Sequence, residues 1–263
     1  MMASMDDVIE LPEDFSGQVR LFPLPDLVLF PHAMQPLHIF EPRYCEMLDD
    51  ALASDQLIAM ATLAGGVQSL HVQQPTIHAT VCIGKIVSHV ETEDGRHNIL
   101  LIGAKRATVR RELLTNRSFR IADVDVASDF HPPGDMTEYF ALKREVLEAF
   151  AAIIPVSATV QQNLHELMAG QMGLGPITDI ISFTLPLSTG AKLSLLAESD
   201  VCQRARRLTR MLRERFIEKQ GAASGKSGSQ GGTGESDKSE LAQWSAQLGG
   251  DGDRGFPPPF SVN

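Results

Sequence analysis

The run Gly225-Lys226-Ser227 is the part of the sequence that comes nearest to a nucleotide-binding motif. An ATPase phosphate loop has the spacing GxxxxGK[ST], in which backbone amides cradle the phosphates while the lysine and the hydroxyl contact them. The first glycine of that spacing falls on Gln220, and Gly221 stands one residue too close. No strand pattern precedes the run, and its flanks are rich in glycine and serine. We therefore interpret it as linker and expect no nucleotide or other cofactor.

Peptidase and metal chemistry lack their motifs as well. A serine peptidase with a lysine base needs both side chains within hydrogen-bond reach. Ser182 and Lys192 lie near each other in the sequence, but no PxDGPSAG-like or GxSxG segment is present. We interpret them as a serine at the edge of the core and a surface lysine. The histidines, including His32 and His38, show no HExxH or other metal-ligand spacing, so we expect no catalytic residue and no metal ligand.

The last amphipathic segment of the sequence concentrates arginine. Its basic residues are Arg204, Arg206, Arg207, Arg210, Arg213 and Arg215. The acidic residues that partly balance them are Glu198, Asp200, Glu214 and Glu218. Such a cluster could contact RNA, but the formal net charge of −10 disfavours a general nucleic-acid binder. We interpret the cluster as a solvated helix face with local ion pairs and keep nucleic-acid binding as an alternative.

The composition also indicates a location. The opening residues, MMASMDDVIELPEDF, are acidic and lack the basic-then-apolar pattern of a signal peptide. No apolar run approaches the roughly 18 residues of a membrane-spanning helix, and net negative charge disfavours anionic membrane surfaces. Three widely spaced cysteines, Cys45, Cys82 and Cys202, fit a reducing compartment. We expect a cytoplasmic protein that does not bind membranes.

Residues 19–131 have the pattern of a β-sheet with one helix. Four prolines between Arg20 and Phe40 divide an apolar run into short strands and turns. Alternating segments follow, and the turn at Glu93–Arg96 indicates a hairpin. We expect a helix over Glu41–Ser54. The expected strands are 57–63, 76–91, 97–103, 107–114 and 119–127.

The run His131-Pro132-Pro133-Gly134 is the predicted boundary, because the apolar period changes to 3.6 after it. Residues 135–219 are predicted to form a helical bundle. Its expected helices are Thr137–Ile154, one capped by Ser157, Pro176–Leu185, Ala191–Ala197, and a last one capped by Ser199.

The two ends of the chain are expected to lie outside the packed region. Residues 1–18 form an acidic, flexible lead-in, and residues 220–263 form a glycine- and serine-rich linker and tail. The linker has too little apolar surface to offset the entropy of ordering it. The last stretch, Leu241–Asn263, regains apolar side chains and either ends in a short docking motif or is an untethered tail. Those side chains are Trp244, Leu248, Phe256 and Phe260.

Several motifs together resemble a known family. LFPLPDLVLFPHAMQPLHIFEPRYCEMLDDAL, followed by QLIAMATL, is similar to the opening of the N-terminal, substrate-binding domain of Lon proteases. The resemblance continues through CIGKIVSHVETEDGRHNILLIGAKRATVRRELL and TDIISFTLPLSTGAKLSLLAESDVCQRARRLTRMLRE, so that it spans roughly residues 19 to 218. It implies an α+β fold, in which a PUA-like β-barrel is followed by a helical bundle.

The resemblance also implies a function. In full-length Lon proteases this unit recruits unfolded or tagged polypeptides and precedes an ATPase and a serine-lysine peptidase. Because the sequence lacks both catalytic parts, we expect a stand-alone polypeptide-binding module for protein quality control, whose partners include such polypeptides and a full-length Lon protease. On the resemblance alone, the alternative is that the chain is classed as an ATP-dependent protease. The expected binding residues are Phe40, Glu41, Arg43 and Tyr44, although Phe40 and Tyr44 fit a core role equally well.

Overall fold

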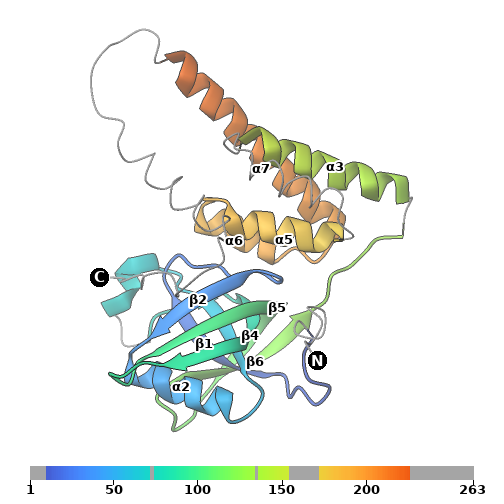
Figure 1. Cartoon of the computed structure of the whole chain (residues 1–263). Coiled ribbons are helices and arrows are strands. Elements are labelled where there is room, and N and C mark those ends of the chain that lie inside the picture. Colours follow the sequence, from blue (N-terminus) through green and yellow to red (C-terminus); the bar gives the residue numbers. More distant parts are fainter. Residues whose placement is uncertain (1–9, 72–73, 134–135, 154–171, 226–263) are drawn as a thin grey trace. The chain divides into compact units, whose positions relative to one another are not determined.

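The computed structural model describes residues 10–71, 74–133, 136–153 and 172–225 (Figure 1). Contacts divide the chain into two compact units. Among the described residues, unit 1 contains those up to His131 together with Asp179–Val201. Unit 2 contains those within Pro132–Thr178 and those from Cys202 onward. No helix in the described part is long and apolar enough to cross a membrane.

Unit 1 is built on a six-stranded mixed sheet within the described residues. The strands are β1 (Gln18–Leu24), β2 (Met34–Ile39), β3 (Leu57–Thr62), β4 (Thr80–Glu91), β5 (His97–Leu113) and β6 (Arg120–Ala127). Their order is β2-β5-β4-β3-β1-β6, and β6 pairs with β5 as well as with β1. The pairings β5-β4-β3-β1-β6-β5 therefore close into a ring, to which β2 is added outside the ring along β5. Among these six described strands, β1 and β3 are the one parallel pair.

Strand β5 corrects the prediction of two separate strands at 97–103 and 107–114. It is continuous because its first part pairs with β2 and its second part with β6. Gly103 lies inside it, where an added Cβ would stand 1.9 Å from the backbone oxygen of Phe30. This glycine permits a close approach of two backbones and does not end the strand. The preceding strand, β4, begins at Thr80 and not at residue 76, while Ile77 forms an isolated bridge to Leu63.

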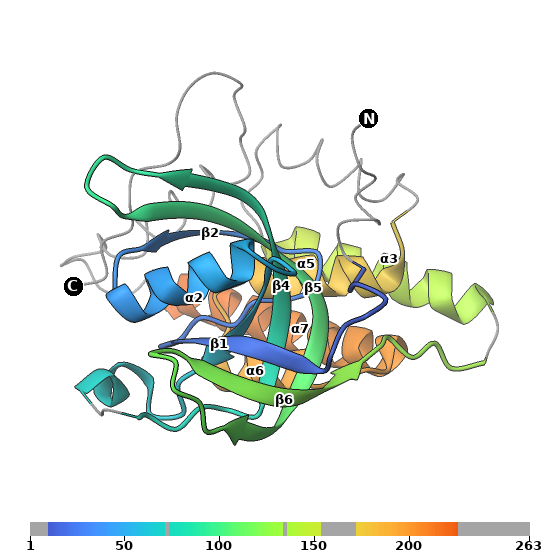
Figure 2. The same cartoon turned by 90° about the horizontal axis from the view of Figure 1, so that it is seen from below.

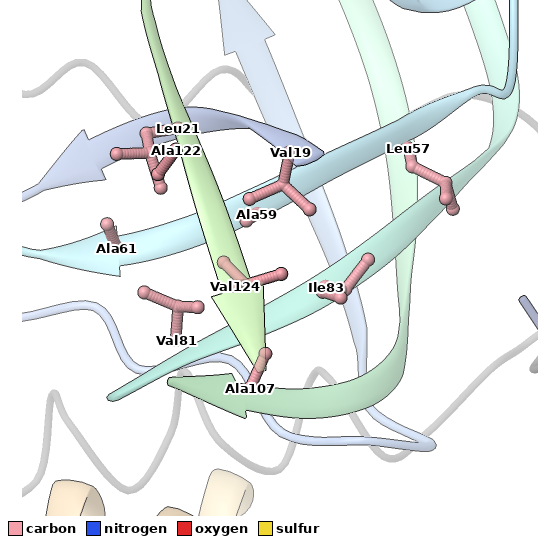
Figure 3. Packing of buried hydrophobic residues seen from close by; sticks show 10 residues of the cluster. All are labelled: Val19, Leu21, Leu57, Ala59, Ala61, Val81, Ile83, Ala107, Ala122 and Val124. Carbon is pink, nitrogen blue, oxygen red and sulfur yellow. The ribbon is translucent and has the colours of Figure 1, made fainter. Parts of the chain in front are cut away.

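The ring encloses a small apolar core (Figure 3). Its buried members are Val19, Leu21, Leu57, Ala59, Ala61, Val81, Ile83, Ala107, Ala122 and Val124. They recur at every second position, so one face of each strand is committed to the interior. Leu11 and Phe15 also pack against this core. Residues 11 and 15 of the predicted flexible lead-in are therefore held against the sheet.

Helix α2 (Pro42–Leu52) follows β2, as predicted, and begins with proline in its first turn. It buries Tyr44, Met47, Leu48 and Ala51. Arg20 of β1 fixes the end of this helix, since its Nε and Nη1 donate to Asp50 and Asp55 at 2.6 and 2.7 Å. Removing that guanidinium would leave the carboxylate of Asp55 without this cationic partner, while Asp50 would keep Arg117, which donates to it at 2.8 Å.

The remaining described helices are α3 (Met136–Ile153), α5 (Leu174–Thr184), α6 (Thr189–Leu196) and α7 (Val201–Gly225). Helix α6 lies in unit 1, and the Ser188 hydroxyl caps it by accepting from the amide of Ala191 at 3.3 Å. Helix α7 begins at Val201, so Asp200 and not Ser199 precedes it. It continues to Gly225 and thus includes the first residues of the predicted linker. The predicted helix after Ser157 lies outside the described residues.

Candidate functional surface

The four expected binding residues lie at the turn between β2 and α2, but they differ in exposure. Phe40 is 55% exposed, whereas Tyr44 is only 7% exposed. The Tyr44 ring packs on Phe22 with 4.5 Å between ring centroids, and burial raises the pKa of its hydroxyl. Arg43 donates to Glu41 Oε2 at 2.7 Å and covers the Tyr44 ring at 4.7 Å. Phe40 is thus the residue of the four that offers uncovered apolar surface.

A larger apolar surface lies on the same strands. Side chains at directly paired positions of neighbouring strands project from the same face. Pairing places His38 beside Asn98, and Asn98 beside Val90. We call the resulting surface of β2, β5 and β4 the outer face. Its residues are Met34, Pro36, His38, Phe40, Asn98, Leu100, Ser88 and Val90.

The outer face is apolar without being covered by the described residues. Met34 is 53% and Val90 is 45% exposed, comparable to Phe40. The rings of His38 and Phe40 lie 5.8 Å apart, and His38 Nδ1 bonds Asn98 Oδ1 at 2.8 Å. The strands and the adjoining turn can be followed in Figure 2. Exposed apolar side chains gathered on one face can mark an interaction surface, and here they alternate with the polar side chains of His38, Asn98 and Ser88.

One end of the outer face is already covered by the chain itself. Ile102, which pairs with Met34, is buried together with Ala104, and Leu11 packs against both. Leu11 belongs to an irregular segment that precedes β1. The face therefore accepts an apolar side chain from a segment without regular structure.

The free edge of β2 is less suited to binding than the face. Among the described strands, β2 pairs only with β5 and so leaves its other edge unpaired. Pro36 lies in the middle of β2 and has no backbone N–H to donate. A proline on an edge strand hinders the addition of another strand. The geometry favours contact through side chains of the outer face.

A buried charged cluster lies elsewhere in unit 1. Arg106 of β5 is 3% exposed. Its Nη2 donates to both carboxylate oxygens of Asp179, its Nη1 to Asp129, and its Nε to the carbonyl of Leu196 at 3.1 Å. A cavity of about 280 Å³ adjoins it and includes both Lys105 and Glu10 in its lining. Since the guanidinium is engaged by carboxylates and a carbonyl, we interpret Arg106 as a structural tie from β5 to α5 and α6.

Ser182 and Lys192 do not have the environment of a catalytic pair. Ser182 is fully buried, so a substrate cannot reach its hydroxyl. Lys192 Nζ donates to the carbonyl of Phe183 at 2.7 Å, and burial lowers the pKa of this lysine to about 8. The prediction of a surface lysine is wrong, because the side chain of Lys192 is largely withdrawn from solvent. Its carbonyl contact explains how an ammonium group is accommodated there.

The histidines have structural contacts in the described part of the chain. The backbone amide of His32 donates to Gly103 at 2.8 Å, and His32 has a positive φ of 64°. His89 Nε2 lies 3.0 Å from His97 Nδ1 in a two-histidine contact. Within the described residues, no group of three or more His, Cys, Asp or Glu side chains is placed to hold a metal ion.

The arginines of α7 contact other residues of unit 2. Arg204 is fully buried and its Nε donates to Thr178 Oγ1 at 3.2 Å. Arg206 pairs with Glu138, and Arg213 pairs with Glu145 at 3.3 Å. Arg204 is thus used inside the unit, whereas Arg206, Arg210 and Arg213 are exposed on one face of α7, where Glu138 and Glu145 balance two of the three charges.

The closed ring of strand pairings with helices beside it defines an α+β domain, and comparison with known proteins identifies its family. The sequence of the ATP-dependent protease La (LON) substrate-binding domain matches residues 18–214. The chain belongs to this family, as its motifs predicted. That domain is a substrate-binding part of the protease, separate from its catalytic parts.

Two curated relatives illustrate the similarity. The Lon protease of Azospirillum brasilense is 25% identical over 213 residues, which cover 79% of this chain and 25% of that protein. The Lon protease of Roseiflexus castenholzii is 28% identical over 210 residues, which cover 78% of this chain and 25% of that protein. The chain spans about a quarter of the length of these relatives.

Two solved structures share the fold. A Lon N-terminal domain protein from Xanthomonas campestris aligns with a TM-score of 0.51 at 24% identity, covering 73% of this chain and 96% of that one. The N-terminal domain of Mycobacterium avium complex Lon protease aligns with a TM-score of 0.56 at 16% identity, covering 74% and 98%. They confirm the α+β class that the sequence predicted.

Proposed function

We propose that this chain is a non-catalytic module that binds unfolded or tagged polypeptides through the outer face. The observation that supports this most directly is the set of half-exposed apolar side chains at Met34, Phe40 and Val90. An unfolded polypeptide differs from a folded one in presenting apolar side chains. A surface that offers apolar side chains without deep pockets therefore distinguishes unfolded from folded polypeptides and does not require one particular sequence.

The size of the surface indicates weak binding. Complete burial of one large apolar side chain contributes about 1.5–3 kcal/mol. Three side chains that are already half-covered therefore contribute roughly 2–5 kcal/mol in total, which must offset the cost of immobilising a flexible partner. We expect dissociation constants in the millimolar range for a single segment. Clients that contact several sites should be held more tightly.

A binding measurement with matched variants tests the proposal. The probe is a fluorescent, reduced and carboxymethylated lactalbumin, which cannot refold. The face variant carries Met34→Ser and Phe40→Ser, and the control carries Leu114→Ser, an equally apolar and fully exposed residue outside the face. We expect affinity to fall about tenfold in the face variant only, or roughly 1.4 kcal/mol. Equal affinity of the three proteins, with folding confirmed, would refute the outer face as the site.

We propose further that the module acts as an adaptor or recognition factor in proteolysis and has no ATPase or peptidase activity. Family membership supports the link to proteolysis. The proposed partners are client polypeptides and a full-length Lon protease, and the three widely spaced cysteines of the sequence support a reducing, cytoplasmic setting. Incubation of the purified chain with a labelled unfolded protein and ATP is expected to leave the substrate intact. Degradation that persists in protein purified by two independent routes would overturn this part of the proposal.

We also propose that the binding module consists of a β-barrel and a helical bundle. The closed ring of pairings supports a PUA-like β-barrel in residues 19–131, and α3 and α7 of unit 2 support a helical bundle within residues 135–219, to which α6 of unit 1 does not belong. Residues 220–263 are proposed to lie outside the binding module as linker, whereas Leu11 and Phe15 of the expected lead-in 1–18 pack against its core. Client binding by a chain that ends at Gln220 checks the last boundary.

Nucleic acid is the second candidate ligand, and we propose that it is not bound. The arginine contacts of α7 support this, because Arg206 and Arg213 already face carboxylates. An RNA ligand would require affinity that falls steeply with salt. A titration with labelled RNA at two salt concentrations, with Arg206→Gln and Arg210→Gln beside the parent protein, tests this exclusion.

A further inference from the structure

The three strands of the outer face have a second free edge, which lies along the last part of β4. Strand β3 pairs with β4 as far as Lys85, and the next amide, that of Ile86, donates to the carbonyl of Gln56 at 2.9 Å. A register shift follows between Ile86 and Ser88. From Ser88 to Glu91, no described strand pairs with β4 on the side away from β5. We call Ser88–Glu91 the β4 edge, and Figure 2 shows this part of β4 at the border of the three strands.

Two residues of the β4 edge direct their backbone groups away from β5. In an antiparallel pair, residues that exchange hydrogen bonds with the partner strand alternate with residues whose N–H and C=O groups face away from it. The amide of Thr92 donates to the carbonyl of Arg96 at 2.7 Å, at the closed end of the hairpin. Alternation from this bond places the N–H and C=O groups of His89 and Glu91 on the open side of β4. Among the described residues, no backbone hydrogen bond occupies these groups.

The β4 edge is better suited to accept a further strand than the edge of β2. His89 and Glu91 each offer a backbone N–H and a C=O, whereas Pro36 of β2 has no N–H. A polypeptide that adds to a sheet edge is held by backbone hydrogen bonds, while its alternate side chains give specificity. In an antiparallel addition, Val90 faces the new strand in a non-hydrogen-bonded pair, in which side chains approach most closely. The new strand therefore covers Val90, which is 45% exposed on the outer face.

The charges beside the β4 edge indicate the chemistry of its partner. Glu91 is exposed and projects from the face opposite to Val90, because successive side chains of a strand alternate. Exposed Glu93 and Asp94 follow in the turn, where Arg96 pairs with Asp94. A side chain directly opposite a carboxylate stabilises the strand pair when it is basic. A second copy of the chain carries the same net charge of −10, which disfavours association between copies. The favoured partner is an extended segment in which an apolar residue adjoins a basic one.

We propose that a client polypeptide adds an antiparallel strand to the β4 edge, with an apolar residue opposite Val90 and a basic residue opposite Glu91. This inference rests on the proposed function and specifies the segments that the outer face binds. Every unfolded polypeptide supplies the backbone hydrogen bonds, so the edge tolerates many sequences. A folded protein has already paired the backbone groups of its strands, so the edge adds to the discrimination between unfolded and folded partners.

Amide hydrogen exchange of the full chain, followed by NMR, tests the strand addition. The probe is a peptide in which valine occupies every second position and lysine or serine the positions between. Saturation with this peptide should slow exchange of the His89 and Glu91 amides at least about tenfold. The amide of His38, which alternation places on the free side of β2, is the internal control and should not change. Unchanged exchange at His89 and Glu91 overturns the proposal, as does protection of His38 instead. Protection that is present without peptide and disappears on dilution also overturns it, because a second copy then occupies the edge.

A pair of variants at one position separates the backbone from the charge. Glu91→Pro removes an N–H that faces away from β5, whereas Glu91→Ala removes the carboxylate and keeps the N–H. We expect the affinity for the peptide to fall about tenfold in Glu91→Pro and about threefold in Glu91→Ala. Urea denaturation verifies that both variants are folded. Equal affinities of the two folded variants would contradict the strand addition.

Methylation of the peptide backbone gives the same test without altering the protein. N-methyl groups at the lysine and serine positions remove the donors that face β4, and should abolish binding. N-methyl groups at the valine positions face away from β4 and should preserve it. Equal binding of the two methylated peptides overturns the proposal. If the parent chain binds carboxymethylated lactalbumin through the outer face but fails these tests, the proposed function stands and the strand addition is refuted. If it binds neither the peptide nor lactalbumin, the proposed function itself is refuted.

Discussion

The two faces of the three strands β2, β5 and β4 have the same backbone and opposite environments. On the inner face, Ile39, Ile99 and Leu101 are almost completely buried. On the outer face, Met34, Phe40 and Val90 keep about half of their surface. Both faces carry large apolar side chains, so the presence of such a side chain does not distinguish them. The difference is that tertiary packing covers one face, and an apolar residue therefore stabilises the fold on one side and remains available for binding on the other.

The largest expected difference in free energy of unfolding is between alanine substitutions of Tyr44 and Phe40, which are four residues apart at the same turn. Tyr44→Ala removes a ring that packs on Phe22 and should lower the free energy of unfolding by about 3–5 kcal/mol. Phe40→Ala removes a half-exposed ring and should cost less than about 1 kcal/mol. Urea denaturation of both variants measures the two values. Equal losses would mean that Phe40 belongs to the core and would remove it from the outer face.

A pair on the sheet itself sharpens the comparison. Ile99 and Val90 lie on adjacent strands but on opposite faces. Ile99→Ala should destabilise the protein by about 2–4 kcal/mol through the cavity it leaves. Val90→Ala should cost about 0.5 kcal/mol, of which part reflects the preference of valine for strands. Client affinity should show the reverse order, since only Val90→Ala alters the outer face. A client affinity that follows stability in both variants would contradict separate roles for the two faces.

Periodicity made much of this arrangement predictable. The hairpin of β4 and β5 and helix α2 follow from alternation, turn residues and Pro42. The continuity of β5 was missed, because Gly103 reads as a break until the close approach of Phe30 is known. The periodicity of a segment does not reveal which other element it packs against. It therefore could not place α6 in the same unit as the sheet.

The candidate surface was predictable only in part. Phe40 was expected at a binding surface, whereas Met34 and Val90 were not singled out. In the sequence, an apolar residue on an uncovered face has the same appearance as one in the core. Tyr44 is the converse case, since the sequence left its core and binding roles open and its ring packs on Phe22. Exposure depends on contacts between distant segments, such as that of Leu11 with Ile102, and short-range patterns do not contain them.

The smallest expected effect concerns burial of a charge and is measured by pH. Burial lowers the pKa of Lys192 to about 8, below the value near 10.4 expected in the unfolded chain. Between these two values the unfolded state binds more protons than the folded state, so stability should rise as pH increases from about 8 to about 10. Because the side chain keeps some exposure, we expect a gain of only about 1–2 kcal/mol.

Lys192→Met retains the length of the apolar stem and removes the titration. The rise in stability between pH 7 and pH 10 should therefore be smaller in this variant than in the parent chain by about 1–2 kcal/mol. Lys105→Met is the matched control, because Lys105 pairs with Glu10 near the surface, and it should keep the full rise. Denaturant midpoints at the two pH values measure all three proteins. An identical pH dependence in the parent and Lys192→Met would show that this ammonium is solvated. Lys192 would then not be a partly buried charge, with an environment intermediate between those of the covered and the uncovered face.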